Sequence, residues 1–279
     1  MINFNGTLVS QDSNILTQNR GFLYGDAVFE TVKIVNSKVL YLEDHYFRLM
    51  ASMRVVRMEI PMNFTMEYFE EQLLALTDKM AISNLARARI TVFRKDGGYY
   101  LPVDRTVSFL VHASVLDTVL YSFEKKVYEV DLFKDFYITK QLLSSIKSTN
   151  RILNVTASIF ADENGLDNCL LLNDSKNVVE AIQGNIFMVL GGKLITPPVS
   201  EGCLNGVMRK QILSLAKTIQ GLEVVEEVIS PFDLQKADEL FISNVIKGIQ
   251  PITKYRKKTF NTNIAEQLVG KLNEQLSAF

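Results

Sequence analysis

Hydrophobic and polar residues follow two different periods in the first half of the chain. The opening MINFNGTLVS predicts a short hairpin, because its Asn5-Gly6 pair favours the tight turns that join antiparallel strands. AVFETVKIVNSKVLYLEDH predicts two strands joined by Asn36-Ser37. From His45 to Met58 the apolar residues recur at helical spacing, which predicts a helix.

A second helix is predicted over residues 62–82, with Thr65 as its N-cap. It is followed by two strands, ARARITVFR and RTVSFLVHASV, which flank the loop KDGGYYLPVD. The pattern loosens around residues 116–123, and we place a domain boundary there.

The second half mixes hairpins with separate helices. We predict a helix over 150–165 that ends at Gly165, and hairpins over 169–181 and 185–197, the latter with Gly191-Gly192 at its tip. Further predicted elements are a helix over 206–220, a strand over 221–229, a short helix opened by Ser230-Pro231, a strand over 238–245 and an amphipathic helix over 260–279.

This order of elements favours an α+β protein of two domains over a doubly wound sheet. The predicted organisation is a smaller N-terminal α/β domain over 1–117, a linker over 118–123 and a larger C-terminal domain over 124–279. The C-terminal domain is expected to be a mixed α/β domain rich in antiparallel strands.

Composition narrows the possible partners and location. The 279 residues carry a net charge of −1, which does not favour nucleic acid or an anionic membrane as a partner. The N-terminus lacks the features of a signal peptide, and no apolar run approaches the length of a membrane span. We therefore expect a cytoplasmic protein. The two cysteines, Cys169 and Cys203, are expected to be small buried side chains.

The absence of several motifs narrows the chemistry. The two histidines, His45 and His112, have no carboxylate or cysteine at ligand spacing, so no metal site is expected. The sequence contains no Walker loop and no glycine-rich dinucleotide fingerprint. If the protein is an enzyme, a cofactor is expected to carry the difficult chemistry.

Three residues, Lys147, Glu180 and Gly206, are candidates for a catalytic site. Lys147 lies in SSIKSTNRILNV just before a predicted helix, and by itself would be interpreted as a surface lysine. Glu180 ends an apolar strand, where a carboxylate is costly unless it is paired. Gly206, in LNGVMR, begins a predicted helix whose free N–H groups favour an anion such as phosphate.

Together these segments resemble the class IV family of pyridoxal-phosphate enzymes, also called fold type IV. The resemblance rests first on EAIQGNIF, LIT and LNGVMR, whose spacing matches that family. It extends over nearly the whole chain through NRGFLYGDAVFETVK, HYFRLMAS, ITVFRKDGG, IKSTNR and LFISNVIKGIQPI. The family includes branched-chain aminotransferases, D-amino-acid aminotransferases and aminodeoxychorismate lyases.

The resemblance implies roles for particular residues. Lys147 would attach pyridoxal 5'-phosphate covalently and move the proton, and Glu180 would keep the pyridine nitrogen protonated. The phosphate would be held by Arg48 and the backbone of Gly206, Val207 and Met208, with side-chain contacts from Ser243 and Asn244. Candidates for the substrate side are Tyr24, Phe29, Arg94 and Arg151, and candidates for the partner of the phenolate oxygen are Asn150 and Lys140.

The residues that follow Lys147 help to distinguish a lyase from an aminotransferase. Asn150-Arg151 resembles the lyase pattern, and the tyrosine usual in branched-chain aminotransferases is absent. D-amino-acid aminotransferases tend to have a histidine where Asp96 stands. We therefore rank a 4-amino-4-deoxychorismate lyase, which releases pyruvate and forms 4-aminobenzoate for folate synthesis, ahead of a branched-chain or D-amino-acid aminotransferase using 2-oxoglutarate.

A third hypothesis is a protein that binds the cofactor, or a related anion, without turnover. The presence of both Lys147 and Glu180 argues against it. The resemblance also implies a homodimer that acts on a small amine or amino-acid-like substrate.

Overall fold

The computed structural model describes residues 1–10, 18–124 and 126–277. Unit 1 comprises Met1–Val119 and Ile146–Asn150, and unit 2 comprises Leu120–Ser145 and Arg151–Phe279. Nothing in the sequence indicated that Ile146–Asn150 would return to the first unit. None of the helices in the described ranges is long and apolar enough to span a membrane.

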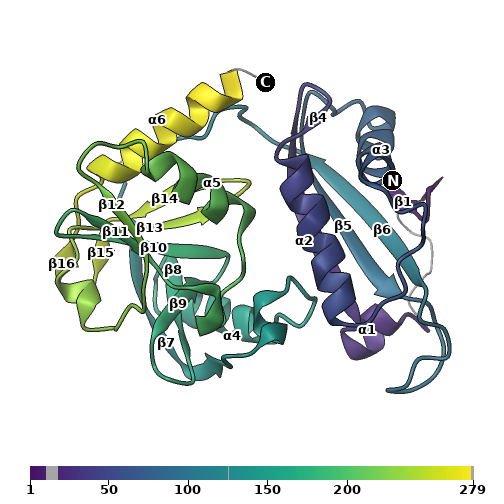
Figure 1. The fold of residues 1–279 in the computed structure, drawn as a ribbon, viewed down its shortest axis with the longest axis horizontal. Helices are drawn as coiled ribbons and strands as arrows, with labels where there is room; N and C mark the ends of the chain where they lie inside the picture. Colours follow the sequence, from purple (N-terminus) through teal and green to yellow (C-terminus); the bar gives the residue numbers. More distant parts are fainter. Residues whose placement is uncertain (11–17, 125, 278–279) are drawn as a thin grey trace. The chain divides into compact units, whose positions relative to one another are not determined.

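Unit 1 is built on an antiparallel sheet in the order β2-β1-β6-β5-β3-β4. The strands are β1 (Ile2–Phe4), β2 (Thr7–Val9), β3 (Ala27–Val35), β4 (Lys38–Val39), β5 (Leu85–Arg94) and β6 (Val107–Val115). The helices are α1 (Arg20–Tyr24), α2 (Leu42–Val55) and α3 (Met66–Lys79). Contacts of α2 with β3 and of α3 with β5 and β6 place both long helices on one face of the sheet (Figure 1).

The predicted turns and caps of unit 1 are confirmed. Asn5 and Gly6 both have positive φ, as the tight turn between β1 and β2 requires. The side chain of Thr65 accepts a hydrogen bond from the Tyr68 N–H at the start of α3. The helix predicted from His45 begins one turn earlier, at Leu42.

Alternation along β3 decides which residues face the helices. Val28, Val32 and Ile34 belong to the apolar core that β3 shares with α2 and α3. Glu30 lies between them in the same alternation, so its carboxylate also faces the helices. Phe29 and the other odd-numbered residues of β3 face the opposite side of the sheet.

Unit 2 is built on a larger mixed sheet in the order β12-β11-β10-β9-β8-β7-β15-β16, with β13 paired to β10 and β14 to β13. Its first strands are β7 (Glu129–Ile138), β8 (Asn168–Asn173), β9 (Val178–Ala181), β10 (Gly184–Leu190) and β11 (Lys193–Thr196). The others are β12 (Glu223–Glu226), β13 (Glu239–Asn244), β14 (Gly248–Ile252), β15 (Lys254–Tyr255) and β16 (Lys258–Thr259).

The long helices of unit 2 are α4 (Ile152–Glu163), α5 (Val207–Ala216) and α6 (Asn263–Ser277) (Figure 1). Short 3-10 helices lie at Leu142–Ser145, Val199–Glu201 and Asp233–Gln235. The last two residues of the helix predicted over 260–279 lie outside the described residues. The α+β class predicted from the sequence is confirmed.

Two details of unit 2 differ from the prediction. The short helix predicted from Ser230 is a single 3-10 turn, Asp233–Gln235, and Asp233 accepts a hydrogen bond from the Ser230 N–H just before it. Strands β7, β14, β15 and β16 were not predicted. Both cysteines are buried, as predicted, and burial raises the pKa of Cys203 to about 12.

Candidate active site

The segment that carries Lys147 lies along the edge of β3 that β5 does not occupy. The Phe29 N–H donates to the Lys147 carbonyl at 2.8 Å, and the Thr149 N–H donates to the Ala27 carbonyl at 3.0 Å. The bridge between Val28 and Ser148 is antiparallel, so Lys147 stands opposite Phe29 on the side of the sheet away from the helices. Lys147 is therefore held by strand pairing rather than by a free loop.

Phe29 is the centre of a small group on that face. The Lys147 Nζ lies 4.6 Å from the centre of the Phe29 ring, and the Arg89 guanidinium carbon lies 3.7 Å from it. Arg89 stands opposite Thr31 in the pairing of β3 with β5, one row along from Phe29. Successive rows on one face of a strand are about 7 Å apart. A guanidinium thus lies within reach of a small molecule held at Lys147.

The same face is basic over several rows. Arg89 stands opposite His112, and Arg87 stands opposite Lys33. Burial lowers the pKa of His112, and the charges of Arg89 and Arg87 lower it further. No acidic side chain stands in the rows of β3, β5 and β6 that share this face. The face that presents Lys147 is therefore suited to an anionic ligand.

On the helix side of β3, Glu30 binds two residues of α2. Its Oε2 accepts from His45 Nδ1 at 2.8 Å and from Arg48 at 2.6 Å, and its Oε1 accepts from Arg48 Nε at 2.7 Å. His45 and Arg48 are three residues apart on α2, so both side chains lie on one side of the helix.

Charge within this cluster follows from burial and pairing. Burial by itself would raise the pKa of Glu30, but the charge of Arg48 and hydrogen bonds from His45 and Arg48 lower it to about 2. Burial lowers the pKa of His45, against the pull of Glu30 and with help from the charges of Arg48 and Lys147. At neutral pH the cluster therefore contains an anionic Glu30, a neutral His45 and a cationic Arg48.

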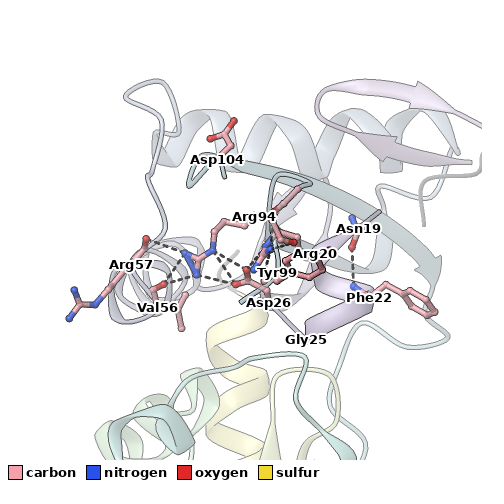
Figure 2. A network of polar contacts seen from close by, with 12 residues as sticks. Asn19, Arg20, Phe22, Gly25, Asp26, Val56, Arg57, Arg94, Tyr99 and Asp104 are labelled. Atoms are coloured by element: carbon pink, nitrogen blue, oxygen red, sulfur yellow. Dashed lines mark hydrogen bonds and ion pairs between the residues drawn. The ribbon is translucent and has the colours of Figure 1, made fainter. Parts of the chain in front are cut away.

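A second ionic cluster in unit 1 is centred on Asp26. Figure 2 shows Arg20 and Arg94 converging on this carboxylate, which Arg20 Nε approaches to 3.0 Å and Arg94 Nη2 to 3.0 Å. The remaining donors of Arg94 bind the Val56 and Arg57 carbonyls at the end of α2. The substrate role predicted for Arg94 stays a prediction, and a substrate carboxylate would compete with these bonds.

Arg20 ties the loop between β5 and β6 to the same cluster. Its Nη1 donates to the Gly97, Gly98 and Tyr99 carbonyls at 2.9, 3.2 and 2.7 Å (Figure 2). Tyr24, a candidate for the substrate side, lies under the Arg20 guanidinium at 5.0 Å and is exposed. Its role also stays a prediction.

Asn150 fastens the lysine segment to the turn before β3. Its amide donates to the Gly25 carbonyl at 3.1 Å. Gly25 has a φ of 63°, and a Cβ on it would lie 2.3 Å from Asn150 Oδ1, so only glycine fits this approach. A contact of Asn150 with a phenolate oxygen would compete with this structural bond.

In unit 2, Glu180, Asn185 and Ser243 stand side by side on three neighbouring strands. Asn185 of β10 is paired with Glu180 of β9 on one side and with Ser243 of β13 on the other. Residues directly opposite one another in antiparallel strands share a face. All three side chains are buried to 5 % exposure or less.

Glu180 and Asn185 together hold the segment that precedes α5. Glu180 Oε2 accepts from the Leu204 N–H at 3.1 Å, and Asn185 Nδ2 donates to the Leu204 carbonyl at 2.8 Å. A Cβ on Gly206 would lie 1.9 Å from Asn185 Oδ1, so the close approach needs glycine. Gly206 is confirmed as the residue at which the helix begins.

The start of α5 and Ser243 fit a phosphate group. The N-cap of α5 is Gly206, which has no side chain to cap the first N–H groups, and Val207 and Met208 are buried. The Ser243 hydroxyl is buried and has no hydrogen-bond partner among the described residues. Oxygen acceptors of a phosphate would satisfy donors of both kinds. These features of unit 2 fit pyridoxal phosphate.

Other predicted site residues have structural partners. The Asn244 Oδ1 accepts from the Ile246 and Lys247 N–H groups, and its amide donates to the Gln183 carbonyl. Lys140 forms an ion pair with Glu201 at 2.8 Å. Arg151 stands at the N-cap of α4. The cofactor or substrate roles of these three residues stay predictions.

Several residues of these clusters were not identified from the sequence as site residues. They are Arg20, Asp26, Glu30, His45 and Arg89 in unit 1 and Asn185 in unit 2. For Glu30 a signal existed, since it is an acid within AVFETVKIV, where every residue is buried. Arg89 is brought next to Phe29 by the register of β5 on β3, and this register cannot be predicted from the sequence.

Comparisons with known proteins agree with this geometry. The model of the family described as amino-transferase class IV matches residues 27–255. A putative branched-chain-amino-acid aminotransferase of Methanocaldococcus jannaschii is 30% identical over 277 residues, 98% of this chain and 94% of that protein. A D-alanine aminotransferase of Listeria innocua is 31% identical over 257 residues, 87% of this chain and 82% of that protein.

Solved structures show the same fold. A branched-chain aminotransferase of Thermoproteus uzoniensis, crystallised with norvaline, has a TM-score of 0.86 at 22% identity, covering 99% of this chain and 97% of that one. A putative 4-amino-4-deoxychorismate lyase of Legionella pneumophila has a TM-score of 0.79 at 24% identity, covering 92% and 94%. The fold-type-IV architecture predicted from the motifs is confirmed.

Proposed function

Because this chain belongs to the class IV aminotransferase family, we propose that it transfers the amino group of a small amino acid to a keto acid. Enzymes of this family use pyridoxal phosphate. Two relatives at about the same identity, which align with 98% and 87% of the chain, are named as aminotransferases. The observation that carries the proposal is the placement of Lys147 and Arg89 on either side of Phe29, on a face without acidic residues.

When bound, pyridoxal phosphate supplies an electron sink for the carbon that loses its proton. In the proposed reaction Lys147 is the attachment point and carries the proton to and from that carbon. Strand pairing with β3 fixes the backbone of Lys147 and thereby the face of the sheet on which its side chain lies. Glu180 is the proposed partner of the pyridine nitrogen, and its Oε2 also accepts a hydrogen bond from the Leu204 N–H.

Arg48 and the start of α5 are the proposed phosphate ligands, with the Ser243 hydroxyl as an additional donor. Arg48 uses the edge formed by Nε and Nη2 to bind Glu30. The proposed phosphate contact is therefore made on the opposite edge of the guanidinium, where Nη1 lies.

Arg89 is the proposed partner of a substrate carboxylate. It lies one row from Phe29, and its Nε donates to the Thr91 hydroxyl at 3.2 Å, which helps to hold the guanidinium on this face of the sheet. A dicarboxylate such as 2-oxoglutarate has a second anionic group at a suitable distance from its reacting carbon. We therefore propose that Arg89 favours dicarboxylate acceptors.

This role of Arg89 is tested by comparing two neighbouring arginines on the same face. Arg89→Leu is expected to raise the KM for 2-oxoglutarate by roughly 10- to 100-fold, the usual cost of losing a charged hydrogen bond. The KM for pyruvate, which lacks the second carboxylate, should change much less. Arg87→Leu, one row further from Phe29, is the matched control. Equal effects of the two substitutions would contradict the assignment.

A 4-amino-4-deoxychorismate lyase is the second candidate. The specific observation in its favour is the Asn150-Arg151 pair after Lys147, together with the absence of a tyrosine there. The same lysine and glutamate would serve it. The sequence relatives change the order of the two hypotheses, because those named above are aminotransferases.

One pair of incubations separates the two reactions. The protein is incubated with amino acids plus 2-oxoglutarate, and separately with aminodeoxychorismate without any keto acid. We expect amino-group transfer in the first and no aromatic product in the second. Release of 4-aminobenzoate and pyruvate without an acceptor would overturn the aminotransferase assignment and establish the lyase.

We also propose that the protein is a homodimer, as the resemblance implies, which light scattering at micromolar concentration would test. Its cytoplasmic location stays a prediction from the sequence. If neither incubation gives turnover while the cofactor binds, the third hypothesis, a non-catalytic binding protein, replaces both.

A further inference from the structure

His45 is a fully buried histidine for which the proposed reaction has no direct use. It has no solvent exposure, and its Nδ1 lies 2.8 Å from Glu30 Oε2. Because the Glu30 carboxylate is anionic, Nδ1 is the protonated nitrogen of the neutral ring. The other nitrogen, Nε2, has no hydrogen-bond partner among the described residues.

This arrangement is costly for the fold. A buried acceptor without a partner costs about 1–3 kcal/mol, and an apolar side chain of similar size would avoid that cost. The neighbouring core of unit 1 is apolar, with Leu49 and Met53 of α2 almost fully buried. What the histidine provides that leucine would not is the hydrogen bond donated to Glu30.

That hydrogen bond fixes the orientation of the Glu30 carboxylate. Glu30 Oε2 receives both His45 Nδ1 and Arg48 Nη2, while Oε1 receives Arg48 Nε. The bidentate contact by itself leaves the carboxylate and guanidinium free to rotate together. A third donor from a rigid, buried ring removes that freedom, because the ring cannot follow the rotation.

The fixed orientation of Glu30 also fixes the direction of the Arg48 nitrogen that faces away from Glu30. With Nε and Nη2 held by Glu30, the direction of Nη1 is set by the same plane. The Arg48 side chain is 14% exposed, whereas those of Glu30 and His45 are 1% and 0% exposed. Arg48 is thus the most exposed side chain of the cluster.

We propose that His45 is a positioning residue that acts through Glu30 to aim the Arg48 guanidinium at the cofactor phosphate. The proposal rests on the proposed function, since it takes Arg48 as a phosphate ligand. It assigns to His45 neither contact with the cofactor nor a proton-transfer step. Its neutral form also leaves Arg48 as the only cation of the cluster.

The test measures dissociation constants for pyridoxal phosphate and for pyridoxal, which lacks the phosphate. Asparagine places its amide N–H where Nδ1 stands, so His45→Asn should keep the bond to Glu30 and bind pyridoxal phosphate within about twofold of the wild type. Glutamine places its amide nearer the Nε2 position. His45→Gln should therefore weaken pyridoxal phosphate by roughly tenfold. Pyridoxal binding should be the same in both variants.

Ser52→Ala is the matched control for a general disturbance of α2. Ser52 is buried one turn after Arg48 and its hydroxyl donates to the Arg48 carbonyl, so it touches the backbone of Arg48 without touching the guanidinium. It should not change the ratio of the two dissociation constants. Equal ratios in His45→Asn and His45→Gln, or a loss for pyridoxal as large as that for pyridoxal phosphate, would overturn the proposal.

Arg48→Leu distinguishes failure of the positioning role of His45 from failure of the phosphate role of Arg48. If Arg48→Leu loses affinity for pyridoxal phosphate selectively and His45→Gln does not, Arg48 is a phosphate ligand and the positioning role of His45 is refuted. If Arg48→Leu itself shows no selective loss, the phosphate role of Arg48 is refuted and the inference falls with it.

Discussion

The two units organise their functional residues by different means. In unit 1 side chains bind each other: Glu30 pairs with Arg48 and accepts a hydrogen bond from the neutral His45, and Asp26 pairs with Arg20 and Arg94. In unit 2 the side chains bind the backbone, with Glu180 and Asn185 on the two polar groups of Leu204.

The difference indicates how each half responds to change. An ionic cluster depends on charge, so unit 1 should be sensitive to pH and to neutral substitutions of equal shape. Side-chain contacts to the backbone depend on close approach, so unit 2 should be sensitive to added volume at Gly206. Three substitutions test this contrast, in order of decreasing expected effect.

The largest effect is expected from Glu30→Gln, which keeps the shape of the side chain and removes its charge. Removing one partner of a buried ion pair costs about 3–5 kcal/mol, because Arg48 loses its counter-charge. Chemical denaturation at pH 7, followed by circular dichroism, measures the loss. A loss of unfolding free energy below about 1 kcal/mol would be typical of an exposed ion pair and would contradict the charge dependence expected of unit 1.

Acid titration of the wild type gives the same cluster a second test. The folded pKa of Glu30 is about 2 and its usual value is 4.5, so the unfolded chain takes up the proton first as pH falls. The stabilisation is therefore present above pH 4.5 and is lost progressively towards pH 2, by about 3 kcal/mol. In Glu30→Gln this component of the acid dependence should be missing. Identical acid profiles would refute the assigned pairing.

A middle-sized effect is expected from Gly206→Ala in unit 2. The added Cβ would lie 1.9 Å from Asn185 Oδ1, so either the buried Asn185 amide or the start of α5 must shift, at about 1–3 kcal/mol. The matched control is Gly270→Ala in α6, where a Cβ meets nothing within 4 Å and should stabilise the helix by about 0.5–1 kcal/mol. Both are measured by denaturation at two pH values. At both pH values we expect Gly206→Ala to lower the free energy of unfolding and Gly270→Ala to raise it. A strong pH dependence of the Gly206→Ala effect would contradict the proposed difference between the two units.

The smallest effect is expected from Thr65→Ala, which removes the cap of α3 at a distance in sequence from both ionic clusters. The lost hydrogen bond to the Tyr68 N–H should cost about 1 kcal/mol without altering cofactor affinity. Denaturation and a cofactor titration on one sample measure both quantities. If Thr65→Ala also weakened cofactor binding, a general loss of stability in unit 1 would explain the changes in cofactor affinity that are assigned to its ionic clusters.

Local patterns predicted most of the elements, because hairpin turns and helix caps are decided by neighbouring residues. Asn5-Gly6, Thr65 and Gly206 each act within a few residues, and each was identified from the sequence. Strand β7 was not identified, because DLFKDFYI mixes polar and apolar residues and one of its sides is completed by β8, which is distant in sequence.

The candidate site was predicted unevenly for a similar reason. Lys147 and Glu180 were identified through motif spacing. Glu30, Arg89 and Asp26 depend on the register of β3 with β5 or on contacts with α1 and α2, and register is a tertiary property. Arg94 was chosen for its position at the end of a strand, where the structure shows contacts with Asp26 and with α2. Patterns identify residue types and alternation, but pairing partners come from the folded chain.

The most direct test of the central claim is the site of cofactor attachment. The protein is loaded with pyridoxal phosphate, reduced with borohydride, digested and analysed by peptide mass spectrometry. We expect the reduced cofactor on the peptide that contains Lys147, and its loss in Lys147→Ala. Stoichiometric labelling of another lysine, or a bleachable visible band retained in Lys147→Ala, would contradict it.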